Sequence, residues 1–320
     1  MKAAVLHELG KPPRCEDFAE PAAEKGEAII RVCSASLKAV DKQLAAGSHF
    51  ASPREFPVIC GTDGVGTLPD GSRVFFGGPR RPFGSMAQRT VAPAAFCFPL
   101  PDALDDATAA ALPNPGVSAL LSLKHRAKVV KGETVLILGA TGVTGELAVQ
   151  IAKLLGAGRV VASGRNPKVL EKLRSLGADV IIQLDQPDDE LKKAFASEAG
   201  EAGFNVVIDY LWGRPTEVFL AAITRPEFAI VNSETRLVQV GESAGPVITL
   251  PAAVLRSTAL TILGTAGIPS RDVLVGAMQQ ILDWGAKRAL QIETESVPLS
   301  EIEEVWQRPE TTGRRLVVIP

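Results

Sequence analysis

The residues best suited by type and spacing to bind a ligand are three glycines in the middle of the chain. Gly139, Gly142 and Gly145 follow an apolar run and open a helical pattern in the stretch LILGATGVTG. The first glycine permits a tight turn, the second lets the backbone approach a pyrophosphate, and the third lets the helix pack closely on the strand. The helix start then offers free N–H groups and a positive dipole end to phosphates. The stretch therefore predicts a dinucleotide-binding turn, whose further contacts are Thr141, Val143 and Thr144.

The residues after the second strand indicate which dinucleotide is bound. A site for NAD carries Asp or Glu about 20 residues after the turn, where it holds the ribose 2′-hydroxyl. This chain has VVASGRNPK there, without a carboxylate, and Ser163, Arg165 and Lys168 can bind a 2′-phosphate instead. Arg165 is the natural planar partner of a phosphate. Two solvated charges are the weaker alternative, because cations at a helix start are unfavourable unless an anion is near. We therefore predict NADP(H) as the cofactor.

Strands and helices alternate from residue 133 onward, and this alternation must position the turn. The six expected strands are TVLILG, RVVAS, ADVIIQL, FNVVIDYL, RLVQVGE and LTILGTAG. Such an order predicts an α/β fold with a doubly wound parallel sheet, whose strands face the ligand crevice at their carboxyl ends. Tyr210 ends the fourth strand, where we expect it to contact the adenosine half of the cofactor rather than do chemistry, although it stays a catalytic candidate. Val240 and Gly241 end the fifth strand as further cofactor contacts.

The first hundred residues have a different character. Short runs rich in Val and Ile alternate with Gly and Pro, which predicts an irregular antiparallel barrel or sandwich with a hairpin at Asp70 and Gly71. A helix is expected to begin at Asp102 or Asp105 and to end at Pro113 and Pro115, before a second helix in VSALLSLKHRAKV. The final strand, RRLVVIP, is expected to pack back on this domain. The predicted domains are 1–112, completed by 268–320, and 113–267.

Composition narrows the class of protein. Of 320 residues, 46% are hydrophobic and 22% charged, and 34 basic residues nearly balance 36 acidic ones. The absence of a basic run argues against nucleic acid, and no apolar stretch approaches the roughly 20 residues of a membrane span. The N-terminus turns polar too early for a secretory signal, so a cytoplasmic location is expected. The cysteines and histidines are dispersed, without the spacing of a zinc site: Cys15, Cys33, Cys60, Cys97, His7, His49 and His125.

This order of parts resembles the medium-chain dehydrogenase/reductase superfamily. The stretches that carry the resemblance are GEAIIRVCSASLKAVDKQLAAG, FPVICGTDGVG, PLPDALDDATAAALPNPGVSAL, GATGVTGELAVQIAKLLGA and LGADVII. The resemblance implies a GroES-like catalytic β-barrel domain, a Rossmann domain that binds NADP(H), and a homodimer formed by edge pairing of LTILGT.

Within that superfamily, the resemblance points to the zinc-free quinone oxidoreductase branch, which uses NADPH. Zinc alcohol dehydrogenases carry Cys at the position of Lys38 and His-Glu at the positions of Thr62 and Asp63, and they insert a four-cysteine lobe that this chain lacks. Neither Lys nor Thr is a plausible zinc ligand. The branch usually has Asn at the position of Lys38 and often Tyr at the position of Gln43, so the substrate pocket differs from that of its better-known members.

The chemistry implied is hydride transfer from NADPH to a small molecule that is already electrophilic, a quinone or an α,β-unsaturated carbonyl, because no metal serves as a Lewis acid. Lys38 is the candidate donor to the developing oxyanion, and burial could lower its pKa enough for proton donation. The alternative is that Lys38 pairs with Asp41 or Asp63 as structure. The resemblance also implies nicotinamide-side roles for Thr62, Asn114 and Ser118. Two other functions stay open: an alcohol dehydrogenase-like enzyme and a non-catalytic NADP(H)-binding redox sensor.

Overall fold

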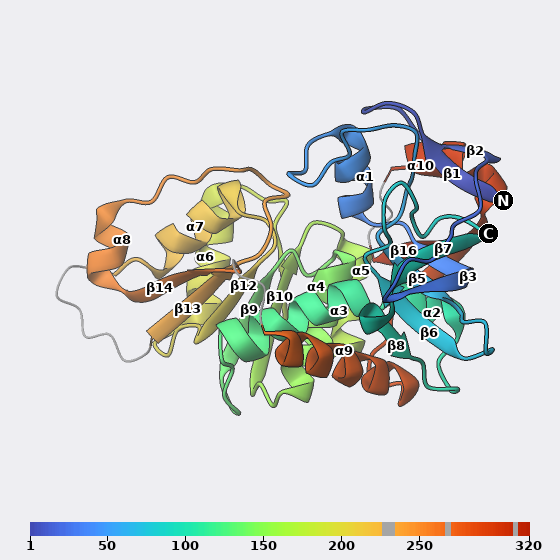
Figure 1. Cartoon of the computed structure of the whole chain (residues 1–320). Helices are drawn as coiled ribbons and strands as arrows, with labels where there is room; N and C mark the ends of the chain where they lie inside the picture. The colour runs from blue at the N-terminus through green and yellow to red at the C-terminus, as the bar shows by residue number, and fades with distance from the viewer. Residues whose placement is uncertain (226–233, 266–269, 310–312) are drawn as a thin grey trace. The chain divides into compact units, whose positions relative to one another are not determined.

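The computed structural model describes residues 1–225, 234–265, 270–309 and 313–320 (Figure 1). The chain divides into two compact units. The first unit contains Met1–Asn114 and Met278–Pro320, and the second contains Pro115–Ala277. The sequence places the earlier boundary between residues 112 and 113, and its later boundary, between residues 267 and 268, lies outside the described residues.

A six-stranded parallel sheet forms the centre of the second unit. Its strands are β9 (Thr134–Leu138), β10 (Arg159–Gly164), β11 (Val180–Gln183), β12 (Val206–Asp209), β13 (Glu234–Gln239) and β14 (Ala259–Gly264). They lie in the order β11-β10-β9-β12-β13-β14, and every neighbouring pair is parallel. The order reverses between β9 and β12, which is the switch point where doubly wound sheets bind ligands. The predicted doubly wound sheet is confirmed.

Helices connect these strands, and their ends follow local sequence signals. The helices are α4 (Val143–Leu154), α5 (Pro167–Ser175), α6 (Asp188–Ala199), α7 (Gly213–Ile223) and α8 (Ala252–Ser257). Asn166 caps α5 by accepting the N–H groups of Lys168 and Val169, and Pro167 is its first residue. Phe195 of α6 and Phe219 of α7 pack edge to face, with ring centroids 5.7 Å apart, in the core that covers β9 and β12.

Antiparallel sheets dominate the first unit. One joins β1 (Lys2–Leu6), β2 (Arg14–Asp17) and β4 (Val58–Ile59), and a larger one contains β3 (Glu27–Ser36), β5 (Asp63–Thr67), β6 (Arg73–Gly77), β7 (Arg89–Pro93), β8 (Cys97–Pro99), β15 (Glu293–Pro298) and β16 (Arg314–Ile319). The predicted hairpin is present as β5–β6, with Gly71 at φ +86° in the turn. The chain end returns as predicted, since β16 pairs with β3. Neither β15 nor the helix α10 (Ile302–Gln307) is predicted from the sequence.

The helices near the division between the units correct one expectation. Asp105 caps α2 (Asp106–Ala111) by accepting the N–H of Thr108. Pro113 does not end that helix but begins the next one, α3 (Pro113–Leu120), because proline suits a first helical position, where its missing N–H is not needed. A π-helical turn at Leu121–Arg126 continues α3. The other helices are α1 (Ala39–Ala46) and α9 (Arg271–Ala286). Within the described ranges, no helix is long and apolar enough to cross a membrane.

Candidate functional site

The glycine turn after β9 has three glycines for three different reasons. Gly139 has φ +88°, and a Cβ there would lie 2.9 Å from Leu211 Cδ2. A Cβ on Gly145 would lie 2.3 Å from Gly139 O, so only glycine lets α4 approach the strand this closely. Gly142 is different, because a Cβ there would meet only Gly139 O, at 3.7 Å, and the residue is exposed. The backbone at Gly142 is therefore open to a ligand, and no side chain caps the start of α4. This is a cradle that fits a pyrophosphate.

The end of β12 lies directly beside this turn, and the end of β13 lies beside the end of β12. Tyr210 N donates to Leu138 O at 3.1 Å, and a Cβ on Gly139 would lie 3.3 Å from Tyr210 Cβ. Val240 N and Gly241 N both donate to Asp209 O, at 2.8 and 3.1 Å. A side chain at Gly241 would collide with Tyr210 O, at 2.7 Å. The predicted residues Tyr210, Val240 and Gly241 therefore lie together at the carboxyl ends of β12 and β13, and Tyr210 is the one at the switch point.

The hydroxyl of Tyr210 is the unusual group at this edge. The residue as a whole is half-buried, but the hydroxyl oxygen is buried and has no hydrogen-bond partner among the residues that the structure describes. Desolvation by burial raises the pKa of the Tyr210 phenol above its ordinary value of 10.0. The phenol therefore stays protonated at neutral pH, which makes it a hydrogen-bond donor. The position of Tyr210 was predicted from the strand pattern, whereas its unpaired hydroxyl was not.

Asp209, which is not predicted from the sequence, fixes the turn that carries Tyr210. Its carboxylate is fully buried, and Oδ1 accepts the N–H groups of Leu211 and Trp212 at 2.8 and 2.9 Å. Oδ2 accepts the hydroxyl of Thr216 at 2.6 Å. Desolvation raises the pKa of Asp209, although these three hydrogen bonds oppose it. Asp side chains often accept backbone N–H groups two or three residues further along the chain and so form an Asx turn. An Asp at the end of a strand is therefore a sequence signal for this turn.

The candidate 2′-phosphate residues follow β10. Arg165 and Lys168 are exposed at the start of α5, and neither side chain forms an ion pair or hydrogen bond with another described residue. Ser163 differs from the expectation, because its side chain is fully buried and its hydroxyl donates to Ile137 O at 3.1 Å. Its hydroxyl therefore holds β10 to β9 and does not face a phosphate. Two unpaired cations at a helix start fit a phosphate that neutralises them.

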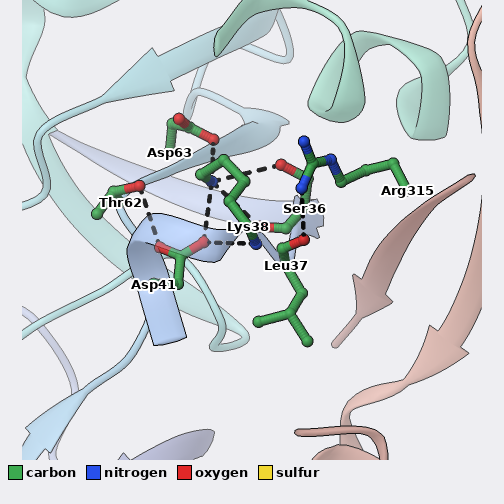
Figure 2. Close-up of polar contacts among 7 residues, drawn as sticks. All are labelled: Ser36, Leu37, Lys38, Asp41, Thr62, Asp63 and Arg315. Carbon is green, nitrogen blue, oxygen red and sulfur yellow. Dashed lines mark hydrogen bonds and ion pairs between the residues drawn. The ribbon is translucent and has the colours of Figure 1, made fainter. Parts of the chain in front are cut away.

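The second candidate site is a buried polar cluster in the first unit, drawn in Figure 2. The Lys38 side chain is only 2% exposed, and its Nζ lies 2.8 Å from Asp63 Oδ1 and 3.3 Å from Asp41 Oδ2. The same nitrogen lies 3.1 Å from Ser36 O and 3.3 Å from Ser36 Oγ. An ammonium group has three protons, and four acceptors surround this one. The three protons of the ammonium therefore have acceptors within the chain.

Local structure explains why these groups meet. Lys38 precedes α1, and Asp41 in the first turn accepts the backbone N–H of Lys38 at 2.9 Å, as in a capping box. Thr62 donates its hydroxyl to the other Asp41 oxygen at 3.1 Å, so this predicted residue orients a carboxylate. Arg315 of β16 donates to Leu37 O at 3.1 Å (Figure 2), which brings the end of the chain to the cluster. Neither Arg315 nor Ser36 is predicted from the sequence as a site residue.

The charge of Lys38 also differs from the expectation. Burial lowers the pKa of the ammonium, but the attraction of Asp41 and Asp63 outweighs it, and the pKa is raised above 10.5. The expectation of a lowered pKa for Lys38 is therefore wrong, because two carboxylates are buried beside the ammonium. In the structure, Lys38 forms ion pairs with both Asp41 and Asp63, as in the structural alternative.

The remaining candidates lie on α3, which crosses the division between the units. Asn114 and Ser118 are four residues apart and so lie on the same face of the helix, and Asn114 is exposed. No group of three His, Cys, Asp or Glu side chains that could hold a metal ion occurs among the described residues. The Lys38 cluster instead surrounds a cation that the chain itself supplies.

Comparison with known proteins finds a dehydrogenase family model and relatives named as oxidoreductases. The family model described as zinc-binding dehydrogenase matches residues 143–287. Quinone oxidoreductase-like protein 2 of Bos taurus is 28% identical over 273 residues, which cover 82% of this chain and 74% of that protein. The 2-methylene-furan-3-one reductase of Solanum lycopersicum is 30% identical over 239 residues, 67% of this chain and 60% of its own length.

Solved structures extend the similarity to the whole chain. The quinone oxidoreductase from Thermus thermophilus, which has also been determined as a complex with NADPH, superposes with a TM-score of 0.80 at 28% identity. The alignment covers 100% of both chains. The similarity therefore includes both units and not the nucleotide-binding unit alone.

Proposed function

The chain belongs to the medium-chain dehydrogenase/reductase superfamily, on its quinone oxidoreductase-like branch, and we propose that it is an NADPH-dependent oxidoreductase that transfers hydride to a quinone or an α,β-unsaturated carbonyl. The proteins it resembles include a quinone oxidoreductase-like protein, a quinone oxidoreductase and a 2-methylene-furan-3-one reductase, which supports a substrate of this kind. The substrate is accordingly a small molecule.

Two features together support the assignment of NADP(H) as the cofactor: the glycine turn and the cations at the start of α5. The turn leaves the backbone at Gly142 open. Arg165 and Lys168, two unpaired cations, follow the next strand, β10, where an NAD site would carry a carboxylate. A guanidinium binds a phosphate with two parallel hydrogen bonds. These residues fit a dinucleotide that carries a 2′-phosphate.

When bound, NADPH supplies the hydride, and the chain supplies orientation and electrostatics. The α4 start and the glycine turn would hold the pyrophosphate, Arg165 and Lys168 the 2′-phosphate, and Asn114 and Ser118 the nicotinamide side. We further propose that Lys38 keeps Asp41 and Asp63 paired rather than donating a proton, because its protons already have acceptors. Its ammonium also opposes a divalent cation at the same place, since like charges repel strongly in a buried site. The proposed reaction therefore uses no metal.

The proposed function is tested by NADPH oxidation with 9,10-phenanthrenequinone and with a simple enone. We expect stoichiometric oxidation of NADPH, followed by its absorbance, and no gain from added zinc. Alcohol oxidation that requires added zinc would favour the alcohol dehydrogenase-like reading. Tight NADPH binding without turnover of either acceptor would favour a redox sensor.

The assembly we propose is a homodimer through β14. This strand forms an edge of the parallel sheet, and half of its residues are exposed. An edge strand leaves backbone N–H and C=O groups available for pairing with another chain. Light scattering coupled to size exclusion should give twice the chain mass of 33.7 kDa. A monomer at micromolar concentration would contradict the dimer without affecting the proposed chemistry.

A further inference from the structure

The buried hydroxyl of Tyr210 has no acceptor among the described residues, although the polar groups around it in the turn are paired. The neighbouring carboxylate of Asp209 accepts three hydrogen bonds, and Tyr210 O accepts the hydroxyl of Ser243 at 3.1 Å. Leaving a buried donor unpaired is costly, and most such groups in proteins find a partner. An orphan in an otherwise satisfied turn therefore marks a place where a ligand supplies the acceptor.

The topology of the sheet identifies which part of the ligand this is. A doubly wound sheet consists of two mononucleotide-binding halves that meet at the switch point. In this chain β9, β10 and β11 form one half, and Arg165 and Lys168 at the 2′-phosphate site follow β10. Tyr210 follows β12 and so belongs to the other half, beside Gly139 at the switch point. This placement favours the nicotinamide half over the adenosine half that the strand pattern predicts for Tyr210.

We propose that the Tyr210 hydroxyl is a specific hydrogen-bond donor to an oxygen of the pyrophosphate or of the nicotinamide ribose, and so positions the reacting half of the dinucleotide. This inference rests on the proposed function. The backbone of Tyr210 lies beside the glycine turn, since its N–H donates to Leu138 O at 3.1 Å and its Cβ would lie 3.3 Å from a Cβ on Gly139. Tyr210 acts as a positioning residue for the nicotinamide half.

Because the Tyr210 hydroxyl has no partner, the variant Tyr210→Phe should change NADPH affinity without lowering the melting temperature. Removing a paired buried hydroxyl destabilises a protein, whereas removing an unpaired one does not. The variant without ligand should therefore melt at the same temperature as the wild type or higher, while its NADPH affinity falls about five- to tenfold. Thr216→Val is the matched control, because the Thr216 hydroxyl is paired with Asp209 at 2.6 Å in the same turn. That variant should melt several degrees lower.

Ligand fragments separate the two halves of the site. Adenosine 2′,5′-bisphosphate carries the adenosine half alone, so Tyr210→Phe should leave its affinity unchanged, whereas Arg165→Ala should weaken both this fragment and NADPH. Equal losses for the fragment and NADPH in Tyr210→Phe would assign the hydroxyl to the adenosine half and overturn the proposal. Unchanged NADPH affinity, or a lower melting temperature without ligand, would also overturn it.

A spectroscopic probe reports on the same residue directly, because Tyr210 is the only tyrosine in the chain. Labelling with 3-fluorotyrosine gives one ¹⁹F resonance, which should shift with NADPH and change little with adenosine 2′,5′-bisphosphate. No shift at saturating NADPH would refute the contact. A wild-type protein that binds neither ligand would instead refute the proposed function, and the present inference with it, whereas normal NADPH binding without the Tyr210 effects refutes this inference alone.

Discussion

The Lys38 cluster and the Tyr210 turn are both buried polar regions, and they differ in whether the polar groups are satisfied. In the cluster, four oxygen atoms surround one ammonium group. In the turn, the carboxylate of Asp209 is satisfied but the Tyr210 hydroxyl is not. A closed network stabilises the fold, whereas an open one leaves a bond for a ligand to complete. Lys38, the candidate for chemistry that the family resemblance indicates, thus lies in the network whose polar groups are satisfied.

The largest effect expected from this contrast is on stability, in Lys38→Met. The variant leaves Asp41 and Asp63 buried without their counter-charge, which costs about 3–5 kcal/mol in comparable buried pairs. Urea unfolding should show this loss, and Lys38→Met combined with Asp63→Asn should recover part of it. Lys193→Ala, which breaks an exposed pair with Glu190, is the control and should change stability by less than about 1 kcal/mol. Wild-type stability together with lost turnover in Lys38→Met would make Lys38 a catalytic residue.

A large effect on both folding and ligand binding is expected for Gly145→Ala. The added Cβ would lie 2.3 Å from Gly139 O and 2.6 Å from Ala140 Cα, so α4 must move away from β9 and from the phosphates. We expect at least about a tenfold loss of NADPH affinity, since a small displacement of a positioned group is costly. Gly276→Ala in α9 is the control, because a Cβ there meets nothing within 4 Å. Calorimetric titration of both variants makes the comparison, and unchanged binding in Gly145→Ala would remove the role assigned to the turn.

A smaller effect is expected for the Tyr210 turn, in the dependence of stability on alkaline pH. The folded-state pKa of Tyr210 lies above its ordinary value of 10.0, so the unfolded chain loses the phenol proton first. Stability present below pH 10 is therefore lost as pH rises above it, by about 1.4 kcal/mol per pH unit for this single group. Tyr210→Phe lacks this term and should gain stability relative to the wild type between pH 9 and 11. Parallel pH profiles in urea unfolding would show that the phenol ionises freely in the folded protein.

Features encoded locally could be predicted from the sequence. The six apolar strands, the Asn166 cap with Pro167 at the first position of α5, and the glycine turn all depend on neighbouring residues. Pro113 was misjudged because proline is compatible with both a helix end and a helix start. Here it begins α3.

Features set by contacts distant in sequence could not be predicted. The Ser163 hydroxyl is bound by Ile137 of the adjacent strand, and the pKa of Lys38 depends on Asp63, a residue 25 positions away. The strand pattern predicts that Tyr210 lies at the end of the fourth strand, and the structure has it directly after β12. Which half of the cofactor it faces depends on the spatial order of the strands, which the sequence does not contain. The sequence shows which residues are polar, and the folded chain decides which of them are already paired.

The most direct test of the cofactor assignment is an equilibrium fluorescence titration of the protein with NADPH and with NADH. The unpaired Arg165 and Lys168 at the start of α5 predict at least about tenfold tighter binding of NADPH, since a charge-assisted bond to a phosphate contributes about this much or more. In Arg165→Ala the preference should shrink, whereas Arg174→Ala, farther along the same helix, should keep it. Equal affinity of the wild type for NADPH and NADH would contradict the assignment.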